Sequence, residues 1–555
     1  MNFKAKVISP LEKVFYDEKI TKFKKYPKSS ALIGEKHNFI VAFTNDEFQN
    51  LRYCLDSCFY RITSDIKENI KVYSVEHVPA VYASHISETH DNYLRQYPGL
   101  FPDILVPIDE TTEFPLNNKL LFSLWIEIDT ANVTPGKHDI TISFTDSDKN
   151  IYASCTHSLK VINAQLPEQE LIVTHWLHTD CIADYYKIGV FSDKYWTALK
   201  NYIKTYVEAG NNMIYTPLFT PPLDTVVGGE RTTVQLVDVS LNDGKYEFGF
   251  EKFRKWVGIC KECGVKYYEM SHLFTQWGAF HAPKIIASVN GKNKKIFGWD
   301  TDSHGKEYED FLAAFLPCLM RELCDNGINE YSYFHISDEP QIDHLESYKA
   351  CSDIIRKYLK GYKIMDAMAN IEFYNEKLVD IPIPYISHSG MFFEKNIKPR
   401  FVYYCGVDTG MMGRSLSMPS SRNRISGTNF YISEVDGFLH WGYNFYNTAR
   451  SLRKINPYYV TDAGRRFCAG DSYVVYPAED LTSYKSIRLA VFRDGLQDMR
   501  AMQLCETLYG RDAVLEVLSE CNNGKLPELL KVPDDPEYTI KVREKLNALI
   551  EKSVK

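Results

Sequence analysis

The chain has 555 residues, of which 45% are hydrophobic and 25% are charged, and its formal net charge at pH 7 is -8. This composition is that of an ordinary globular protein of roughly two to four domains, and it argues against extensive disorder. The acidic balance, without a long basic run, argues against a protein that binds nucleic acid, whereas small neutral partners are compatible with it.

The first residues, Met1–Pro10, have neither the apolar run nor the cleavage signal of a secretory leader. No later segment has the roughly 18 apolar residues of a spanning helix, so we expect a cytoplasmic protein without membrane insertion. The 13 cysteines are odd in number and scattered, which favours a reducing compartment over a disulfide framework. Cys260 and Cys263 form a single CxxC pair without a second one, so we interpret them as plain thiols.

Residues 1–165 carry the pattern of short β-strands separated by turn-forming Asn, Asp, Gly and Pro. Apolar and polar residues alternate on both sides of the turn Thr134–His138, as in a pair of half-buried strands. We therefore expect an N-terminal antiparallel β-sandwich, followed by a polar linker at Asn163–Glu170. The expected strands are Asn38–Phe43, Lys71–Val75, Ile104–Pro107, Lys119–Ile128, His138–Phe144 and Thr156–Ile162.

From residue 166 to residue 510 the pattern changes to a repeat of strand, loop and helix. A parallel crossover needs a dozen or more residues and returns right-handed, so eight strands in this rhythm predict an α/β fold, a (β/α)8 TIM-like barrel. The helices after the fifth and sixth strands are short or absent. The expected strands are Leu171–Leu177, Asn212–Pro217, Lys266–Ser271, Glu330–Ser337, Lys363–Ala369, Pro384–His388, Phe401–Cys405 and Gly437–Trp441.

Helices are expected between several of these strands and after the last one. Their ranges are Asp193–Ala209, Glu251–Cys263, Tyr308–Asp325, Leu345–Lys360 and Ser486–Tyr509. Residues 511–555 contain a polar loop, Lys525–Pro536, and one more helix, Glu537–Lys552. We expect this C-terminal extension to pack on the barrel.

In such a barrel the chemistry takes place at the carboxyl ends of the strands, where the loops meet. Aromatic faces pack on the apolar side of a pyranose ring, while amides, acids and arginine satisfy its hydroxyls. The mixture of side chains at these strand ends therefore suits a sugar, although any single aromatic there is more often a packing residue. The candidate substrate-binding residues are His178, Tyr215, Arg231, His272, Trp277, Asn370, Tyr404, Trp441 and Asn444.

The same strand ends contain side chains that could bind a metal. They are His175, His178, Asp180, His272 and His388. His175 and His178 are three residues apart and would face opposite sides of a strand, which disfavours a zinc site. His335 lies inside a strand and is expected to be a hydrogen-bonded core residue. We therefore expect neither a metal nor a cofactor.

Two adjacent acids, Asp338 and Glu339, follow the fourth strand, and Pro340 ends it. Side chains on a strand alternate between faces, so two neighbours can serve one pocket only where the strand ends and proline breaks the pleat. Exposed acids beside a proline are common in turns. Here, however, the preceding strand is apolar and the acids fall where a barrel places its active site, which favours a catalytic pair.

Several segments stand in a definite order along the chain: Pro221–Thr225, Gly228–Arg231, Phe274–Gly278, His335–Pro340, Asp436–Asn444, Gly470–Pro477 and Ser486–Gly495. Together they resemble glycoside hydrolase family 123, the β-N-acetylgalactosaminidases. The resemblance spans most of the chain, since that family also has a β-sandwich before its barrel. It implies a retaining, substrate-assisted hydrolase of terminal β-linked N-acetylgalactosamine, with Asp338 and Glu339 as the catalytic residues. The substrate would be a small oligosaccharide or a glycolipid-derived glycan.

The chemistry of such a pair is coherent. The 2-acetamido oxygen of the sugar would attack the anomeric carbon, while ionised Asp338 would accept the acetamide N–H and stabilise the positive charge of the ring that forms. Glu339 would protonate the leaving oxygen and later deprotonate water. A neighbouring carboxylate and partial burial both favour a protonated carboxyl group, so we expect Glu339 to keep its proton near neutral pH.

Two alternatives keep the same barrel. In an ordinary two-carboxylate retaining glycosidase, Glu339 would be the acid and base and a carboxylate such as Asp408 the nucleophile. A non-catalytic carbohydrate-binding protein would bind the sugar without turnover, which the presence of both acids disfavours. The sequence makes no prediction of the oligomeric state.

Overall fold

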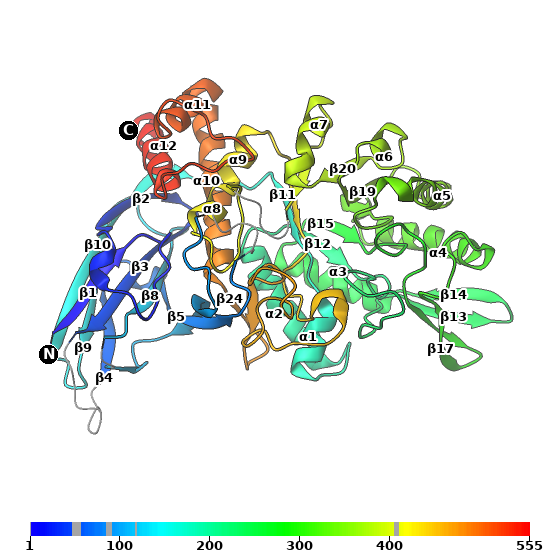
Figure 1. Ribbon diagram of the computed structural model, residues 1–555, viewed down its shortest axis with the longest axis horizontal. Helices are drawn as coiled ribbons and strands as arrows, with labels where there is room; N and C mark the ends of the chain where they lie inside the picture. The colour runs from blue at the N-terminus through cyan, green and yellow to red at the C-terminus, as the bar shows by residue number, and fades with distance from the viewer. Residues whose placement is uncertain (1, 47–56, 85–91, 117–118, 405–409, 555) are drawn as a thin grey trace.

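The computed structural model describes residues 2–46, 57–84, 92–116, 119–404 and 410–554 (Figure 1). The N-terminal strands, blue to cyan in Figure 1, form two five-stranded sheets in the orders β1-β3-β8-β5-β6 and β2-β10-β9-β4-β7. Their pairs are antiparallel except for β10 with β2. The strands are β1 (Phe3–Ile8), β2 (Lys28–Ile33), β3 (Lys36–Asn45), β4 (Ser57–Thr63), β5 (Ile70–Ala80), β6 (Gly99–Ile108), β7 (Phe114–Pro115), β8 (Phe122–Asp129), β9 (Gly136–Thr145) and β10 (Ile151–Gln165).

Aromatic and aliphatic side chains of the two sheets pack against each other. The rings of Phe43 on β3 and Phe144 on β9 have centroids 4.5 Å apart, and both side chains are fully buried. All six strands predicted for this region are confirmed. Strands β1, β2, β4 and β7 were not predicted, although β1 and β4 do alternate apolar and polar residues. Strand β7 has only two residues, too few for any pattern.

The second region contains eight short parallel strands, and each lies at or next to a predicted position. They form a five-stranded sheet, β12-β15-β18-β19-β20, and a three-stranded sheet, β11-β22-β21. The two sheets meet at both edges: Tyr385 after β20 makes a parallel bridge with Tyr403 of β21, and the Asn212 N–H donates to Val173 O of β11 over 3.1 Å. The strands are β11 (Ile172–His175), β12 (Met213–Thr216), β15 (Tyr267–Met270), β18 (Ser332–Phe334), β19 (Lys363–Met368), β20 (Ile381–Pro384), β21 (Phe401–Tyr403) and β22 (Gly437–His440).

The sixth strand lies earlier in the chain than the predicted range Pro384–His388. Strand β20 covers Ile381–Pro384 and pairs with β19, whereas Ile386–His388 is a 3-10 turn. The reason is its composition, because two of its four residues are proline, which normally argues against a paired strand. The end of the predicted seventh strand, at Cys405, lies outside the described residues.

The predicted helices are confirmed with small shifts at their ends, and the helices after the fifth and sixth strands are short. A further sheet, in the order β14-β13-β16-β17, was not predicted. The helices are α1 (Thr179–Tyr186), α2 (Asp193–Glu208), α3 (Glu251–Cys263), α4 (Lys306–Asp325), α5 (Leu345–Arg356), α6 (Glu372–Asn375), α7 (Ser389–Glu394), α8 (Ser421–Arg424), α9 (Ser426–Ile432), α10 (Ile487–Tyr509), α11 (Arg511–Glu520) and α12 (Tyr538–Val554). The added strands are β13 (Asp238–Asn242), β14 (Lys245–Gly249), β16 (Ile285–Val289) and β17 (Lys292–Phe297), with a separate pair β23 (Val475–Pro477) and β24 (Ser483–Lys485).

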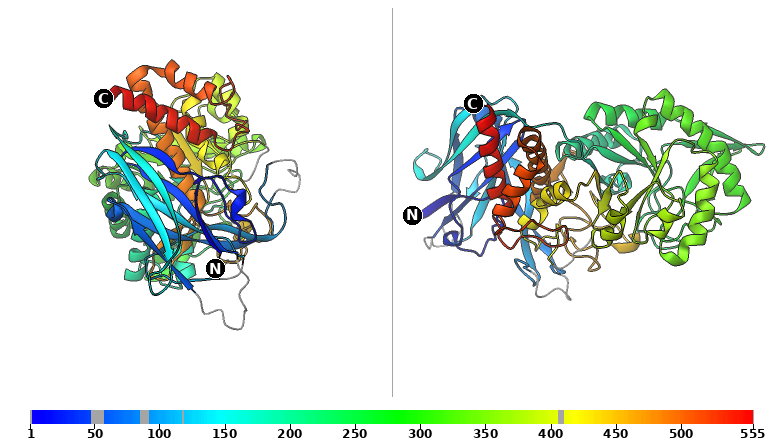
Figure 2. Two further views of the ribbon diagram at one scale, coloured as in Figure 1. Left: turned by 90° about the vertical axis from the view of Figure 1, so that its left-hand side faces the viewer. Right: turned by 90° about the horizontal axis from the view of Figure 1, so that it is seen from above.

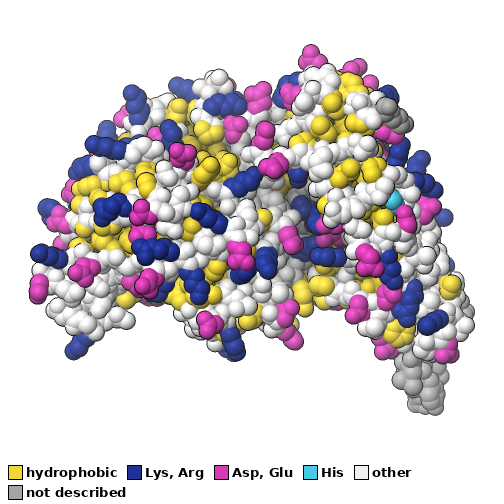
Figure 3. Space-filling view, turned by 180° about the vertical axis from the view of Figure 1, so that it is seen from behind, with side chains coloured by type: hydrophobic (Ala, Val, Ile, Leu, Met, Phe, Trp, Pro, Cys, Tyr) yellow, Lys and Arg dark blue, Asp and Glu magenta, His cyan; other side chains and the backbone are white. Residues whose placement is uncertain are grey.

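Helix α10 lies between the N-terminal sheets and the parallel strands, and α11 and α12 stack beside it (Figure 2). Helix α12 also contacts the first region, since Glu544 accepts hydrogen bonds from the backbone N–H and the hydroxyl of Ser30 at 2.8 and 2.7 Å. On the face shown in Figure 3, basic and acidic side chains are interspersed. Among the helices of the described residues, none combines the length and apolar character needed to cross a membrane.

Candidate active site

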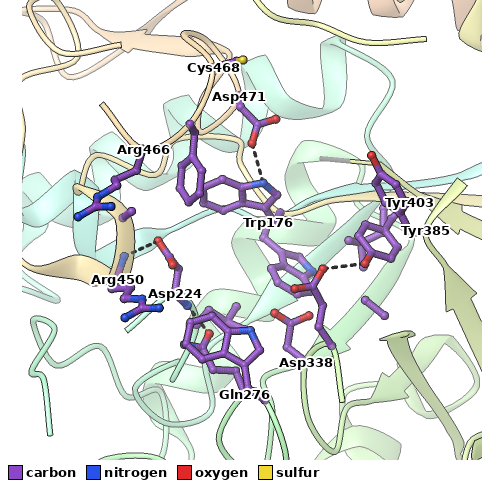
Figure 4. Close-up of a pocket in the computed structure, with 18 of the residues that line it drawn as sticks. Trp176, Asp224, Gln276, Asp338, Tyr385, Tyr403, Arg450, Arg466, Cys468 and Asp471 are labelled. Atoms are coloured by element: carbon purple, nitrogen blue, oxygen red, sulfur yellow. Dashed lines mark hydrogen bonds between the residues drawn. The ribbon is translucent and has the colours of Figure 1, made fainter. Parts of the chain in front are cut away.

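A cavity of about 700 Å³ opens beyond the carboxyl ends of the parallel strands (Figure 4). Its volume lies within the range, roughly 300–1,000 Å³, of pockets that enclose small ligands. The lining residues are Tyr82, Trp176, Leu223, Asp224, Gln276, Trp277, Asp338, Glu339, Ala367, Tyr385, Tyr403, Leu439, Trp441, Ala449, Arg450, Leu452, Arg466, Phe467, Cys468 and Asp471.

Asp338 and Glu339 both line this cavity, and both are half-buried. Glu339 has a left-handed backbone, with φ of 45°, which interrupts the alternation of side chains and lets two neighbours face one space. Its N–H donates to Ala367 O in β19 over 3.1 Å, and its Oε1 accepts the hydroxyl of Tyr403 at 2.7 Å. The Trp277 N–H donates to Asp338 O over 2.8 Å. Neighbouring strand ends therefore fix the pair.

The two acids have different surroundings. Burial raises the pKa of Asp338 well above its ordinary value, and the carboxylates of Glu339 and Asp366 raise it further. The described residues offer the Asp338 carboxylate no hydrogen-bond donor, whereas Glu339 receives the Tyr403 hydroxyl. Burial and two acidic neighbours thus favour the protonated form of Asp338.

A buried network lies behind Asp338. His335 follows β18, and its Nδ1 is 2.8 Å from Asp366 Oδ1 while its Nε2 is 3.1 Å from Glu269 Oε1. These hydrogen bonds and charges outweigh burial and raise the pKa of His335 to about 9. Asp366 also accepts the backbone N–H groups of Ile336 and Ser337 at 3.1 and 3.3 Å. The network thus holds the segment that leads into the acid pair.

His272, His335 and Asp366 are the described residues whose side chains come close enough to be candidate metal ligands, with donor atoms within 4.8 Å of one another. Both ring nitrogens of His335 already contact carboxylates, which favours its protonated form over a metal-bound one. His175, His178 and His388 do not join this cluster. The expectation that His335 is a hydrogen-bonded core residue is confirmed.

Two of the nine residues expected to bind the sugar, Trp277 and Trp441, line the cavity. The indole N–H of Trp441 donates to Asp471 Oδ2 over 3.2 Å. Asn370, in the turn after β19, and the buried Tyr404 are not among the lining residues. The remaining five, which are buried behind the cavity wall, are His178, Tyr215, Arg231, His272 and Asn444.

These five side chains bond to one another or to the scaffold. Arg231 makes two hydrogen bonds to the carboxylate of Asp180, at 2.8 and 2.7 Å. Asn444 accepts the His178 N–H at 2.7 Å and donates to its carbonyl at 3.0 Å. The Tyr215 hydroxyl is 2.8 Å from Nδ1 of His272. These five side chains therefore support the cavity wall from behind.

Several lining residues were not proposed from the sequence. Asp224 lies in the Pro221–Thr225 segment that carries the family resemblance, which is the one signal that could have identified it. Arg450, Arg466 and Asp471 come from the long loop after β22, and Tyr82 comes from the N-terminal region. No local pattern assigns such loop residues to a cavity formed by distant strands. Asp408, the alternative nucleophile, lies outside the described residues.

Left-handed backbone conformations gather at this cavity. Four lining residues other than glycine have positive φ: Asp224 at 38°, Trp277 at 57°, Glu339 at 45° and Arg450 at 61°. Each costs on the order of 1 kcal/mol or more and persists only where surrounding contacts determine it. Such strained positions are typical of functional sites, so they support a binding role for the cavity.

The family model that matches the chain is that of the glycoside hydrolase 123 catalytic domain, over residues 176–505, which is more than half of the chain. A solved family 123 glycoside hydrolase from Clostridium perfringens, described in terms of glycolipid glycan hydrolysis, superposes with a TM-score of 0.76 at 18% identity, covering 99% of this chain and 98% of that one. A putative beta-galactosidase from Bacteroides fragilis matches with a TM-score of 0.33 at 7% identity, covering 87% of this chain and 60% of that one. No curated protein matches the chain.

Proposed function

Because the chain belongs to glycoside hydrolase family 123, we propose that it is a retaining, exo-acting β-N-acetylgalactosaminidase with substrate-assisted catalysis. The observation that carries the proposal is the adjacent pair Asp338 and Glu339, which faces a sugar-sized cavity beside Trp277 and Trp441. Aromatic faces beside carboxylates are the surroundings that a pyranose with polar substituents requires. The described glycolipid glycan hydrolysis of the Clostridium perfringens enzyme supports a glycan substrate.

We also propose that the eight parallel strands form a closed (β/α)8 barrel. The two sheets approach each other at both edges, through Tyr385 with Tyr403 and through Asn212 with Val173. The cavity at the carboxyl ends of the strands lies where such barrels hold their active sites.

In the proposed mechanism Asp338 positions the substrate's own nucleophile. No described residue donates a hydrogen bond to the Asp338 carboxylate, so an acetamide N–H would supply a donor and favour ionisation. The positive charge that develops as the oxazolinium-like ring closes would favour ionised Asp338 further. The raised pKa of free Asp338 is therefore compatible with an ionised state once substrate is bound. Holding the acetamide oxygen near the anomeric carbon also supplies proximity.

Glu339 would donate its proton to the departing glycosidic oxygen and then take one from the water that opens the ring. Microscopically these are the two directions of one proton transfer at the same carboxyl group. The hydroxyl of Tyr403, 2.7 Å from Oε1, fixes the side chain and leaves Oε2 available for the leaving oxygen. Because the sugar supplies the nucleophile, no second carboxylate has to attack the anomeric carbon.

Kinetics of Asp338→Asn and Glu339→Gln on an aryl β-N-acetylgalactosaminide test the proposal. We expect kcat to fall by about 10²–10⁴-fold in Glu339→Gln, the usual worth of general acid–base help. A comparable loss is expected for Asp338→Asn. Asp343→Asn, an exposed acid four residues further along the same loop, is the matched control and should retain activity. Near-normal turnover in either pair variant would reject its assigned role.

A further inference from the structure

Asp224 is a third acid in the cavity, and the proposed mechanism does not use it. It lies in the loop after β12 and lines the cavity. Figure 4 shows it on the side of Arg450 and Gln276, across the cavity from Tyr403, whose hydroxyl bonds to Glu339. Asp224 therefore faces the acid pair from the opposite wall.

Contacts from two other loops hold the backbone of Asp224 and one of its carboxylate oxygens. Its N–H donates to Gln276 Oε1, and its carbonyl accepts the hydroxyl of Ser451 at 2.7 Å. Its Oδ2 accepts the Arg450 N–H at 3.0 Å. The backbone has a φ of 38°, a left-handed conformation that a residue other than glycine adopts only where its surroundings impose it. The carboxylate is thus preorganised.

The carboxylate is also short of donors. A carboxylate can accept about four hydrogen bonds, yet within the described part of the chain Oδ1 has no hydrogen-bond partner and Oδ2 has one. Burial raises the pKa of Asp224 to about 6, against the lowering effects of Arg450 and Arg231. The carboxylate thus has an oxygen at the cavity wall that can accept hydrogen bonds from a bound ligand. Sugar hydroxyls are donors of this kind.

The proposed mechanism orients the sugar between these walls. The C2 acetamide lies at Asp338 and C1 lies at Glu339. In a pyranose chair C4 is the ring carbon across from C1, so its hydroxyl points toward the opposite wall. Resting on the proposed function, we propose that Asp224 accepts the hydrogen bond of the C4 hydroxyl and is the residue that distinguishes galacto from gluco configuration.

This assignment makes Asp224 a specificity-determining residue, because an axial and an equatorial C4 hydroxyl reach different points of the wall. A site built to hydrogen-bond a hydroxyl discriminates against a ligand that lacks it or misplaces it, since the half-buried acceptor then remains unpaired. Asp224→Ala removes the acceptor, while Asp224→Asn keeps the size and one acceptor oxygen.

The experiment compares three substrates: an aryl β-N-acetylgalactosaminide, its 4-deoxy analogue and the gluco epimer. We expect Asp224→Ala to lower kcat/KM about 10- to 150-fold on the galacto substrate, the value of a hydrogen bond to a charged group. On the 4-deoxy substrate Asp224→Ala should lower kcat/KM about threefold or less, because the carboxylate and the missing C4 hydroxyl no longer interact. The galacto to gluco preference should collapse, and Asp224→Asn should fall between wild type and Asp224→Ala.

Glu230→Gln is the control, because this exposed acid of the same loop pairs with Lys284 at 2.7 Å outside the cavity. Binding of free N-acetylgalactosamine and 4-deoxy-N-acetylgalactosamine by calorimetry provides a readout independent of turnover. An equal loss on hydroxy and deoxy sugars in Asp224→Ala would overturn this inference while leaving the proposed function intact. Failure of the wild type to bind or hydrolyse any of these sugars would reject the proposed function and the inference together.

Discussion

Within the described residues, one side-chain hydrogen bond orients the carboxylate of Glu339. Tyr403, at the end of β21, donates its hydroxyl to Oε1 of Glu339 over 2.7 Å. The next residue, Tyr404, is buried among Phe438 and His440 on the other side of the strand end, with ring centroids 5.2 and 5.3 Å away. Two neighbouring tyrosines thus differ in whether they face the cavity.

We expect Tyr403→Phe to lower kcat/KM about tenfold or more, because a hydrogen bond to a charged group is worth about 1.5–3 kcal/mol. Tyr404→Phe should change kcat/KM little, since its hydroxyl is not directed into the cavity. Steady-state kinetics on the aryl substrate measure both variants. Equal effects of the two substitutions would contradict the orientation of Glu339 described here.

His335, in the segment that leads into the acid pair, also contributes to the stability of the fold. Its pKa is raised to about 9 in the folded protein, from an ordinary value of 6.5, by Asp366 and Glu269. A raised folded-state pKa means that the stabilisation is fully present below about pH 6.5 and is lost as pH rises through about 9. The difference between the folded and the ordinary pKa corresponds to about 3 kcal/mol of folding free energy.

Denaturant unfolding at a series of pH values between 6 and 10 tests this expectation. The free energy of unfolding of the wild type should decline over that window, and His335→Gln should lack most of the decline. A wild-type stability that stays level from pH 6.5 to pH 9.5 would show that His335 is not a buried imidazolium.

At the residue scale the sequence predicted the acid pair but few of its neighbours. Asp338 and Glu339 were identifiable because proline and two acids interrupt an apolar strand. Most expected sugar contacts, such as Arg231 and His178, instead lie behind the wall, since a residue at a strand end faces either the cavity or the surrounding helices. A shift of one residue reverses that choice. Asp224 and Arg450 come from loops whose paths no short pattern fixes.

Helices α9 and α10 approach each other through glycine. A Cβ on Gly427 in α9 would lie 1.8 Å from the carbonyl oxygen of Gly495 in α10, and one on Gly495 would lie 2.5 Å from Arg424 O. Backbone atoms cannot yield as a side chain can, so the helices pack this closely only with glycine at both positions. This contact helps to place the loop between α9 and α10, which carries β22 and part of the cavity wall.

Gly427→Ala should therefore destabilise the protein by about 1–3 kcal/mol, the usual cost of overpacking. Gly258→Ala in α3 is the matched control, because it is exposed and no atom lies within 4 Å of the added methyl group. Alanine there should stabilise by about 0.4–1 kcal/mol. Thermal unfolding of both variants measures the contrast, and a neutral Gly427→Ala would contradict the close packing.

At the scale of elements the strand and helix order was predictable, because the helices have clear apolar faces and the strands recur between them. Helix α3 was predicted to the residue, as Glu251–Cys263. The four-stranded sheet of β13, β14, β16 and β17 was missed, because its strands are only five or six residues long and one of them, Lys292–Phe297, is mostly exposed and lysine-rich. The predicted position of strand β20 was too late, because Pro382 and Pro384 argue against a paired strand.

On the scale of the whole molecule, α10 connects the N-terminal sheets with the region of the parallel strands through buried ion pairs. Arg488 makes two hydrogen bonds to Asp103 of β6, at 2.9 and 2.8 Å, and donates to Tyr473 O at 2.8 Å. Arg493 donates to Glu127 of β8 at 2.8 Å. The sequence did not predict this arrangement, because a charged residue inside a helix is usually assigned to its solvated face.

Arg488→Met should destabilise the protein by about 3–5 kcal/mol, since it leaves the buried Asp103 carboxylate without its cation. The double variant Arg488→Met with Asp103→Asn should be more stable than Arg488→Met alone, because no uncompensated charge remains. Lys306→Met, which breaks the exposed pair with Asp310, is the control and should change stability little. A double variant no more stable than the single one would argue against a charge effect.

The most direct test of the central claim is a crystal structure with the thiazoline analogue of N-acetylgalactosamine, a mimic of the bicyclic intermediate. We expect the sugar in the cavity beside Trp277 and Trp441, with the Asp338 carboxylate about 2.7–3.2 Å from the thiazoline nitrogen. Glu339 should lie on the side of C1 from which the aglycone leaves. An analogue bound away from both acids, or a covalent ester of the protein trapped with a fluorosugar, would contradict substrate-assisted catalysis by this pair.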